Sequence, residues 1–371
     1  MKILSIGTDR LLFKTGSEVR RRILDYGELF DELHVIVFAK SDLGLKNEQL
    51  TDNVFLYPTQ SITKINYIFD ALKIGYRILK KDRNNWVITS QDPFETGLIA
   101  WLLKNWFKVT WQAQVHTDFN SPFFKKESFL NRLRSWFGRL LLVRADKIRV
   151  VSERIKKTII PWPLKSEPVV LPIFVPQPLL EKTCPLEQNL HAKYPQFSFI
   201  ILMASRLTKE KNYPLALGAF AEAVAHRPGV GLIIVGDGPQ KDELLRLAKA
   251  LGIEKQVIFG DWSCDLSCYY QTADLFMLTS NYEGYGRTLV EAGLNICPVL
   301  TTEVGLVGEI IDNNNALICP VGDEDCLVEK ISWAVSRSDE LRALVKKLNS
   351  DLATKLVEKN KYLDLYRQIL C

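Results

Sequence analysis

The sequence predicts an α/β fold made of two doubly wound domains, each with a mostly parallel sheet. Short apolar segments alternate with amphipathic helical patterns through both halves of the chain, as is typical of parallel sheets covered by helices. Eight of the sixteen prolines lie within 161–195, where they disfavour helices and central strands. Because 371 residues suffice for two hydrophobic cores, we place an interdomain linker in this stretch.

The first half contains six strand candidates in which apolar and β-branched residues gather between polar turns. Helical periodicity fills most of the intervals between them, as expected for strand–helix–strand units. The predicted strands are 2–6, 33–38, 54–57, 86–89, 109–115 and 147–151, and the predicted helices cover about 17–30, 63–80, 94–106 and 127–143.

The second half repeats this alternation. We predict a domain at 1–175 with its linker at about 161–197, a second domain at 198–345, and a C-terminal helix within 346–371 that returns to the first domain. Carboxyl-end loops of both sheets are expected to face a cleft, where open α/β sheets bind ligands. The predicted strands are 199–204, 231–235, 257–260, 275–279, 299–302 and 316–320, and the helices lie near 213–227, 239–252, 264–272, 287–295, 306–311, 323–337 and 340–370.

The composition is that of a globular protein, with 47% hydrophobic and 25% charged residues. No apolar run approaches the ~20 residues that span a bilayer, and residues 1–7 resemble a first strand more than a signal peptide. The seven cysteines are odd in number and absent from the first 183 residues, which indicates reduced thiols and no disulfide framework. We therefore expect a cytoplasmic protein.

Residues 121–160 contain eleven Lys/Arg against three Asp/Glu, a local excess of eight positive charges, whereas the whole chain carries +5. Aromatic residues such as Phe129 and Trp136 are interleaved with these cations. The pattern has two open interpretations: peripheral contact with an anionic membrane surface, or a helix with a buried aromatic face and a solvated basic face. Nucleic acid is a poor explanation, because no recognition module accompanies the patch.

The segment 281–298 places two carboxylates, Glu283 and Glu291, around a turn with two glycines, Gly284 and Gly286. Glycines let backbone amides approach a ligand, and the start of the following helix adds a partial positive charge. If the segment were wholly helical, the two carboxylates would lie about 12 Å apart. This separation is comparable with the distance between the two ends of a sugar nucleotide. By itself this spacing also fits a loop cap and a solvated helix residue.

A second candidate anion site is the strand-to-helix loop that carries Arg206 and Lys211. Two cations at the carboxyl end of a strand can neutralise a diphosphate without a metal. Lone surface cations at this spacing are usually solvated. The neighbouring motifs therefore decide between a diphosphate site and two solvated surface charges.

Several motifs follow one another in order through 200–335. They are Arg206-Leu207, Lys211-Asn212, Val235-Gly236-Asp237-Gly238-Pro239, Tyr269-Tyr270, Ala273-Asp274-Leu275-Phe276, Ser280, Glu283-Gly284-Tyr285-Gly286, Glu291-Ala292, Pro298-Val299, Val304-Gly305 and Glu309-Ile310-Ile311. This succession resembles the retaining GT-B glycosyltransferases called group 1 (GT family four), whose two Rossmann-like domains face each other across a cleft. The resemblance is weaker in the first half of the chain.

The resemblance implies a role for each matched position. Glu283 would lie at the donor's sugar, Glu291 at the nucleotide ribose, and Arg206 and Lys211 at the donor diphosphate. The turn formed by Gly284, Tyr285 and Gly286 would face the donor through its amides. The implied reaction keeps the anomeric configuration, uses no divalent metal or other cofactor, and lets the departing diphosphate take the acceptor's proton.

The first domain contributes fewer matches. His116 ends the strand 109–115 and resembles the family's active-site histidine, Asp118 is a candidate acceptor contact, and Gly16 aligns with a loop that approaches the donor phosphates. Most relatives have a second glycine where this chain has Ser17, and a glycine where it has Ile296. We interpret the second departure as a change in packing away from the donor.

We also expect no metal site. The letters of a D-x-D motif occur at Asp323-Glu324-Asp325, but there they begin a helix, whose N-terminus favours acidic residues. Base selection is expected in the loop at 260–263.

These features predict a metal-independent, retaining hexosyltransferase that moves a sugar from a nucleotide-sugar donor to a glycan or lipid-linked acceptor in surface polysaccharide or glycolipid assembly. The alternative is a non-catalytic GT-B protein that binds nucleotide or glycan. A Rossmann dehydrogenase is disfavoured, because no G-x-G-x-x-G turn with a following ribose-binding acid is present.

Overall fold

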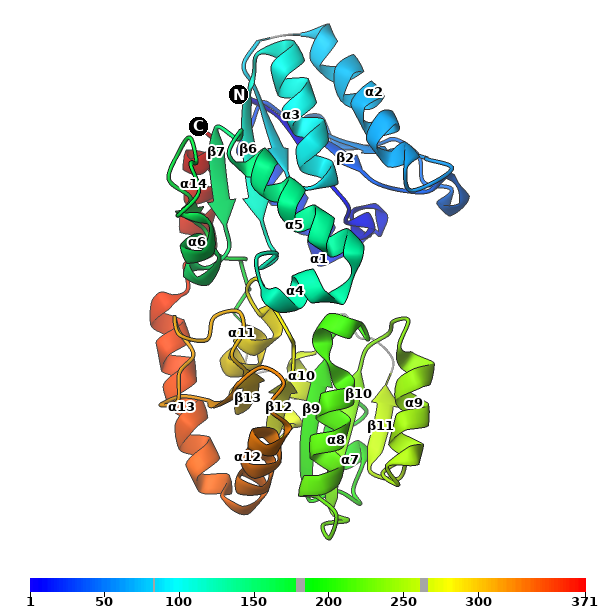
Figure 1. Cartoon of the computed structure of the whole chain (residues 1–371), viewed down its shortest axis with the longest axis vertical. Coiled ribbons are helices and arrows are strands. Elements are labelled where there is room, and N and C mark those ends of the chain that lie inside the picture. Colours follow the sequence, from blue (N-terminus) through cyan, green and yellow to red (C-terminus); the bar gives the residue numbers. More distant parts are fainter. Residues whose placement is uncertain (83, 178–183, 261–265) are drawn as a thin grey trace. The chain divides into compact units, whose positions relative to one another are not determined.

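The computed structural model describes residues 1–82, 84–177, 184–260 and 266–371, which form two compact units (Figure 1). The N-terminal unit consists of Met1–Asn120, Ser128–Pro172 and Glu358–Cys371. The C-terminal unit consists of Ser121–Glu127 and Ile173–Val357. The boundary after Pro172 falls inside the proline-rich stretch.

The N-terminal unit is built on a sheet with strand order β3-β4-β2-β1-β5-β6-β7-β8. All neighbouring strands are parallel except β3 and β4. The six predicted strands are present, whereas β3, which is polar, and β8, which has two residues, lacked a recognisable pattern. The strands are β1 Lys2–Gly7, β2 Glu32–Val37, β3 Glu48–Thr51, β4 Val54–Pro58, β5 Trp86–Ser90, β6 Thr110–Val115, β7 Lys147–Val150 and β8 Val169–Val170.

Helices α2, α3 and α5 lie side by side over one face of this sheet (Figure 1). Helices α1 and α14 come from opposite ends of the chain and pack through stacked rings of Tyr26 and Tyr366, whose centroids are 4.2 Å apart. The last segment of the chain therefore completes the N-terminal unit. The helices are α1 Glu18–Gly27, α2 Asn66–Lys81, α3 Glu95–Phe107, α5 Phe129–Leu142, α6 Glu153–Ile159, which was not predicted, and α14 Lys359–Leu370.

The C-terminal unit contains an all-parallel sheet with strand order β11-β10-β9-β12-β13-β14. In both units the third, second, first, fourth, fifth and sixth major strands follow one another across the sheet. The order reverses between β9 and β12 here, and ligands bind at such switch points. The strands are β9 Phe199–Ala204, β10 Val230–Val235, β11 Val257–Gly260, β12 Leu275–Leu278, β13 Val299–Thr302 and β14 Leu317–Cys319, in agreement with the prediction to within one residue at each end.

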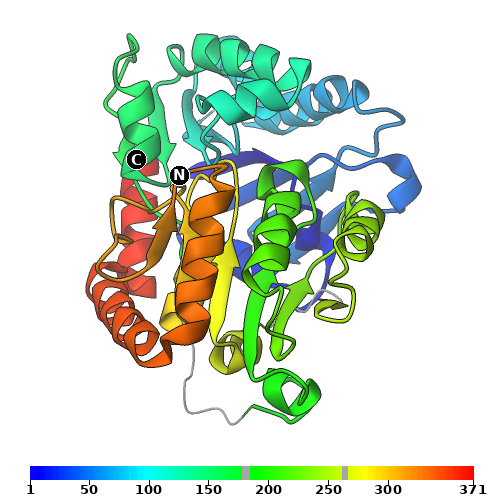
Figure 2. The same ribbon diagram turned by 60° about the horizontal axis from the view of Figure 1, so that its bottom comes forward.

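Helices α8 and α12 of the C-terminal unit pack side by side (Figure 2). Large side chains such as Tyr213 and Phe220 fill the core beneath α8 without solvent exposure. The helices are α4 Pro122–Glu127, α7 Leu190–Lys193, α8 Tyr213–Ala223, α9 Lys241–Ala250, α10 Ser267–Thr272, α11 Arg287–Leu294, α12 Glu324–Ser336 and α13 Ser338–Lys355.

Three helix predictions were wrong in detail. The predicted helix at 306–311 is a turn closed by a bridge between Val307 and Ile311, because Gly305 (φ +57°) and Gly308 (φ +86°) adopt left-handed backbone. The predicted helix at 127–143 is divided at Ser128, which caps α5. The single final helix is two helices, α13 and α14, separated at 356–358.

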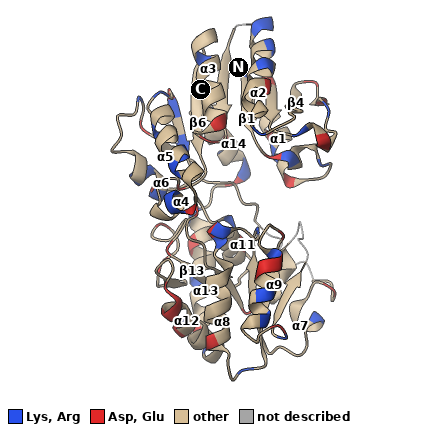
Figure 3. Cartoon of the chain, turned by 45° about the vertical axis from the view of Figure 1, so that its right-hand side comes forward, with Lys and Arg blue, Asp and Glu red and all other residues tan. Residues whose placement is uncertain are grey.

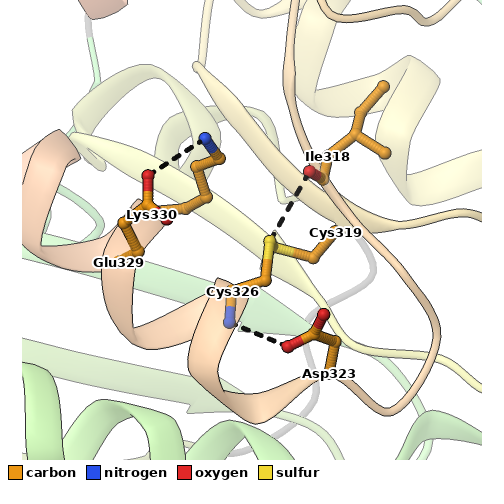
Figure 4. Close-up of a disulfide and its surroundings, with 6 residues drawn as sticks. All are labelled: Ile318, Cys319, Asp323, Cys326, Glu329 and Lys330. Atoms are coloured by element: carbon orange, nitrogen blue, oxygen red, sulfur yellow. Dashed lines mark hydrogen bonds and ion pairs between the residues drawn. A yellow bond between two sulfur atoms is a disulfide. The ribbon is translucent and has the colours of Figure 1, made fainter.

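The expectation of seven reduced thiols was also wrong for one pair. Cys319 at the end of β14 and Cys326 in the first turn of α12 form a disulfide, with Cα atoms 5.8 Å apart (Figure 4). Asp323 caps the same turn by accepting a hydrogen bond from the backbone N–H of Cys326 at 2.9 Å. The acidic start of α12 is therefore a helix cap, as the sequence predicted.

The departure at Ile296 is a matter of backbone conformation. After α11, the N–H of Cys297 donates to the carbonyl of Ala292 and that of Ile296 to the carbonyl of Gly293, which is a Schellman arrangement. This arrangement needs a left-handed residue, and Ile296 has φ +59° with 47% of its side chain exposed. The interpretation as a packing change was therefore incomplete: glycine suits this position because of its φ.

We expect Ile296→Gly to stabilise the protein by about 1 kcal/mol, since it relieves a left-handed strain of roughly 1–2 kcal/mol at some cost in chain entropy. Urea unfolding measures the difference in free energy. Ile296→Ala is the matched control, because it keeps the Cβ that causes the strain. Equal stabilities for the Ala and Gly variants would contradict this explanation.

Candidate functional site

The loops that follow β9 and β12 are joined by hydrogen bonds at the switch point of the C-terminal sheet. The Thr279 hydroxyl donates to the carbonyls of Lys211 (3.0 Å) and Asn212 (3.1 Å). The backbone N–H of Asn281 donates to the carbonyl of Glu210 at 2.7 Å. These contacts hold two loops that are about seventy residues apart in sequence in one fixed arrangement.

Lys211 and Glu283 meet between these loops. The Lys211 ammonium group forms an ion pair with Oε1 of Glu283, and the Ser280 hydroxyl donates to the same oxygen at 2.8 Å. Both charged side chains are largely buried, with 14% and 15% exposure. The sequence predicted two separate ligand contacts, and the structure adds that the two groups orient each other. Ser280 stands among the motifs matched in the sequence, and the structure adds its contact with Glu283.

Glu291 lies on α11, one turn beyond the helix start. Its carboxylate accepts from Nε of Arg287 at 2.6 Å and from the hydroxyl of Tyr270 at 3.1 Å. Glu283 precedes the helix, so the segment between the two carboxylates is a turn followed by helix, and the wholly helical spacing does not apply. Tyr270 also belongs to a motif matched in the sequence, and the structure adds its contact with Glu291.

The turn between the two carboxylates is buried and tightly packed. Gly286 has φ +79° and caps α11. A Cβ on Gly305 would lie 2.5 Å from the carbonyl oxygen of Tyr285, so only glycine lets the loop at 304–305 approach the turn this closely. Gly284 is also buried. The loop at 304–305 therefore supports the turn that is predicted to present its amides to the donor.

Arg206 differs from Lys211 in its surroundings. Its side chain is 77% exposed and contacts Glu210 at 3.4 Å. The loop beneath it rests on the glycine turn after β10, because the N–H of Leu207 donates to the carbonyl of Asp237 at 2.9 Å. A Cβ on Gly236 would lie 2.0 Å from the carbonyl oxygen of Ser205. The glycine turn thus sets the position of the loop that carries Arg206.

In the N-terminal unit, His116 follows β6 directly. Its Nε2 lies 2.8 Å from Oε1 of Gln114, two residues earlier on the strand. Burial, together with the positive charges of Arg149 and Arg22, lowers the pKa of His116 to about 3. The imidazole is therefore neutral at physiological pH and suited to hydrogen bonding with hydroxyl groups.

The other two predicted residues of this unit lie in different loops. Asp118 is partly buried two residues after His116. Gly16 is exposed with φ +78°, and a Cβ there would meet no atom within 4 Å. Ser17, which stands at the place of a second glycine, caps α1: its hydroxyl accepts from the N–H of Arg20 at 3.1 Å and donates to the carbonyl of Leu11 at 2.6 Å.

Of the loop predicted to select the base, the structure describes Gly260 alone, and 261–263 lie outside the described residues. Among the residues that are described, no group of three or more His, Cys, Asp and Glu side chains has the arrangement of a metal site.

Helix α5 exposes two of its three aromatic residues, and the third, Phe137, is partly buried. Phe129 and Trp136 are 69% and 63% exposed, and the residues that it buries include Asn131, Ser135 and Gly138. Figure 3 shows basic residues along the same helix. The interpretation with a buried aromatic face was therefore wrong for α5. In the described part of the chain no helix has the length and apolarity required to cross a bilayer.

Comparisons with known proteins find similar glycosyltransferases. A family model described as "Glycosyl transferases group 1" matches residues 189–350. The lipopolysaccharide core biosynthesis glycosyltransferase LpsE of Rhizobium meliloti is 27% identical over 172 residues, which cover 46% of this chain and 49% of LpsE. The alpha-monoglucosyldiacylglycerol synthase of Streptococcus pneumoniae is 25% identical over 58% of this chain and 51% of its own. The chain thus aligns with about half the length of each of these two relatives.

Solved structures resemble the whole chain. Anabaena Alr3699/HepE in complex with UDP and glucose has a TM-score of 0.79 and 20% identity, covering 100% of this chain and 99% of that one. Sucrose-phosphate synthase from Thermosynechococcus elongatus has a TM-score of 0.81 and 16% identity, with the same coverage. At such identities the likeness concerns the fold. Residues 189–350 thus resemble the group 1 glycosyl transferases, and the chain as a whole has the GT-B fold.

Proposed function

We propose that this protein is a retaining glycosyltransferase that transfers a hexose from a nucleotide-sugar donor to a glycan or lipid-linked acceptor, in surface polysaccharide or glycolipid assembly. The observation that carries the proposal is the Lys211–Glu283 pair at the switch point of the C-terminal sheet. The names of the relatives support the acceptor class, since they include a lipopolysaccharide core glycosyltransferase and a glycolipid synthase.

In the proposed reaction the cations act on the leaving group. As the bond between the sugar and the diphosphate breaks, negative charge develops on the diphosphate, and Lys211 and Arg206 stabilise it. Because Lys211 is already oriented by Glu283 and Ser280, little reorganisation is needed when this charge appears. The two cations would supply the stabilisation that other enzymes take from a divalent metal.

The carboxylates position the donor in this proposal. Glu283 accepts a hydrogen bond from a sugar hydroxyl, Glu291 accepts from the ribose, and the amides of the turn at 284–286 face the donor. His116 binds a hydroxyl of the sugar or acceptor, Asp118 contacts the acceptor, and Gly16 lies in a loop that approaches the phosphates. The acceptor's proton passes to the departing diphosphate, so neither glutamate serves as general acid or base.

Calorimetry with UDP-, GDP- and ADP-sugars tests the donor site, beginning with UDP-glucose because HepE is known with UDP and glucose. We expect one nucleotide series to bind, and the Arg206→Ala/Lys211→Ala variant to lose most of that affinity. Failure of every donor to bind, or equal binding by the variant, would refute the proposal. Binding without release of nucleoside diphosphate in the presence of acceptor glycans would favour the alternative, a non-catalytic nucleotide- or glycan-binding protein.

We also propose that the protein works at the cytoplasmic face of a membrane and touches it peripherally through residues 121–160. The outward aromatic residues of α5 would enter the headgroup region, and Arg132 and Arg139 would pair with anionic lipid. This arrangement would bring the enzyme to lipid-linked acceptors.

Flotation with vesicles that contain phosphatidylglycerol checks the membrane proposal. The wild type is expected to float at low salt and to stay at the bottom of the gradient at high salt, because ions screen the attraction of Arg132 and Arg139 for the lipid. Phe129→Ser/Trp136→Ser should abolish flotation. Leu245→Ser, an exposed apolar residue of α9 that is 45% accessible, is the control and should float normally. If the wild type remains at the bottom of the gradient even at low salt, the proposed membrane contact is wrong.

A further inference from the structure

His116 ends a hydrogen-bonded series that begins at the last helix of the chain. The carbonyl of Ile369 in α14 accepts from Nε2 of Gln112 at 2.9 Å, so Oε1 of Gln112 faces the other way. The hydroxyl of Thr89 donates to that oxygen at 3.3 Å, and accepts from Nε2 of Gln114 at 2.8 Å. Oε1 of Gln114 is then the atom 2.8 Å from Nε2 of His116.

The direction of every bond in this series follows from its first member. A backbone carbonyl can only accept, so Gln112 must donate to Ile369 through its amide nitrogen. The hydroxyl of Thr89 must then give its proton to Gln112, which leaves its lone pairs for Gln114. Because its Nε2 donates to Thr89, Gln114 must direct its Oε1 toward His116.

Arg149 fixes the same orientation independently. It pairs with Gln114 across β7 and β6, and its Nη1 lies 3.3 Å from Oε1 of Gln114. A guanidinium group can only donate. If the side-chain amide of Gln114 were rotated by 180°, its NH₂ group would face the N–H of Arg149 and so lose this hydrogen bond. Arg149 itself is 3% exposed and is held by the carbonyls of Leu171 and Pro172 and by the hydroxyl of Tyr362. It therefore has little freedom to move away.

We propose that Gln114 and Arg149 are positioning residues that hold His116 as the neutral tautomer with its proton on Nε2, so that Nδ1 serves as a hydrogen-bond acceptor. Since Oε1 of Gln114 only accepts, Nε2 of His116 must carry the proton. Among the described residues Nδ1 has no protein partner, and its lone pair is available to a hydroxyl group. The assignment of that hydroxyl to sugar or acceptor rests on the proposed function. The assignment of the tautomer is independent of it.

The surrounding charges favour the neutral ring. Arg149 of β7 and Arg22 of α1 act on His116 as positive charges. Burial raises the pKa of Tyr26 and Tyr366, which lie around Arg149, so these tyrosines stay uncharged and supply no negative charge. Asp118, two residues along the chain, is the nearest carboxylate in sequence. An imidazolium would be buried against the guanidinium of Arg149.

Long-range ¹H–¹⁵N correlation of the full chain with ¹⁵N-labelled histidine tests this inference. The chain has four histidines, and His116→Gln identifies the relevant signals. We expect a protonated Nε2 and an unprotonated Nδ1 for His116, without titration from pH 5 to pH 9. A proton on Nδ1, or titration in this range, would overturn the inference whether or not the protein binds a donor.

Three variants separate positioning from a general structural effect. Gln114→Met removes the acceptor and should abolish the single-tautomer signal. Thr89→Val breaks the link to Gln112 but leaves Arg149 in place, and should retain the tautomer. Gln114→Glu keeps the acceptor and adds a negative charge, so the tautomer should persist while the pKa of His116 rises. An unchanged tautomer in folded Gln114→Met would refute the role of Gln114, and Gln114→Glu still reports if the Met variant does not fold.

Discussion

Lys211→Ala is expected to lower the turnover number about 10²–10³-fold, the effect of removing one preorganised group that stabilises developing negative charge. The substitution also leaves the largely buried carboxylate of Glu283 without its cation, at a cost of about 1–3 kcal/mol in the free energy of unfolding. Release of nucleoside diphosphate from the donor identified by calorimetry measures the first effect, and urea unfolding measures the second.

Two further variants distinguish these effects. Lys209→Ala removes an exposed lysine from the same loop and should leave both quantities nearly unchanged. Lys211→Ala/Glu283→Gln removes the unpaired charge, so it should recover stability without recovering turnover. If turnover returned together with stability, Lys211 would be a structural residue and its proposed role at the diphosphate would be wrong.

Gly236→Ala should weaken donor binding at least tenfold, although Gly236 is not among the proposed donor contacts. The new Cβ would lie 2.0 Å from the carbonyl oxygen of Ser205, so the loop that carries Arg206 and Lys211 must shift. Overpacking of this kind also costs about 1–3 kcal/mol in stability. Calorimetry and urea unfolding of the same variant measure the two losses.

Gly218→Ala is a matched control for this prediction. A Cβ there would lie 2.1 Å from Oε1 of Glu324, the end of a flexible side chain that can move aside. Because Gly218 lies inside α8, alanine also gains helix propensity of about 0.5–1 kcal/mol. Donor binding should therefore be unchanged. Equal losses of affinity in the two variants would show that the backbone contact of Gly236 has no special effect.

The fold was largely predictable because its signals are local. Each strand of the C-terminal sheet is a short apolar run bounded by polar turns, and the predicted ends differ from the observed ones by no more than one residue. The failure at 306–311 has a physical cause: the apolar residues there suggested helical periodicity, whereas Gly305 and Gly308 supply two left-handed positions. Both glycines stand in the sequence, and their tolerance of left-handed backbone argues against a helix there.

The candidate site was predictable as a set of residues and much less as a set of contacts. Glu283 and Lys211 were chosen from separate motifs, but their ion pair joins positions 72 residues apart and depends on the register of β9 and β12. Gln114 could have been noticed, since alternate residues of a strand share a face and His116 follows two positions later. Its link to Ile369 spans far more of the chain, and no local pattern predicts it.

The role of α14 has a consequence for biosynthesis. Arg149 and Tyr26 precede most of the C-terminal unit in the chain, yet the hydroxyl of Tyr362 and the ring of Tyr366 that contact them are translated only after it. Until residues 358–371 appear, the N-terminal unit lacks a helix, and the guanidinium of Arg149 lacks its contact with the hydroxyl of Tyr362. The C-terminal unit, whose residues 173–357 are complete earlier, can therefore finish folding first, contrary to the usual N-to-C order.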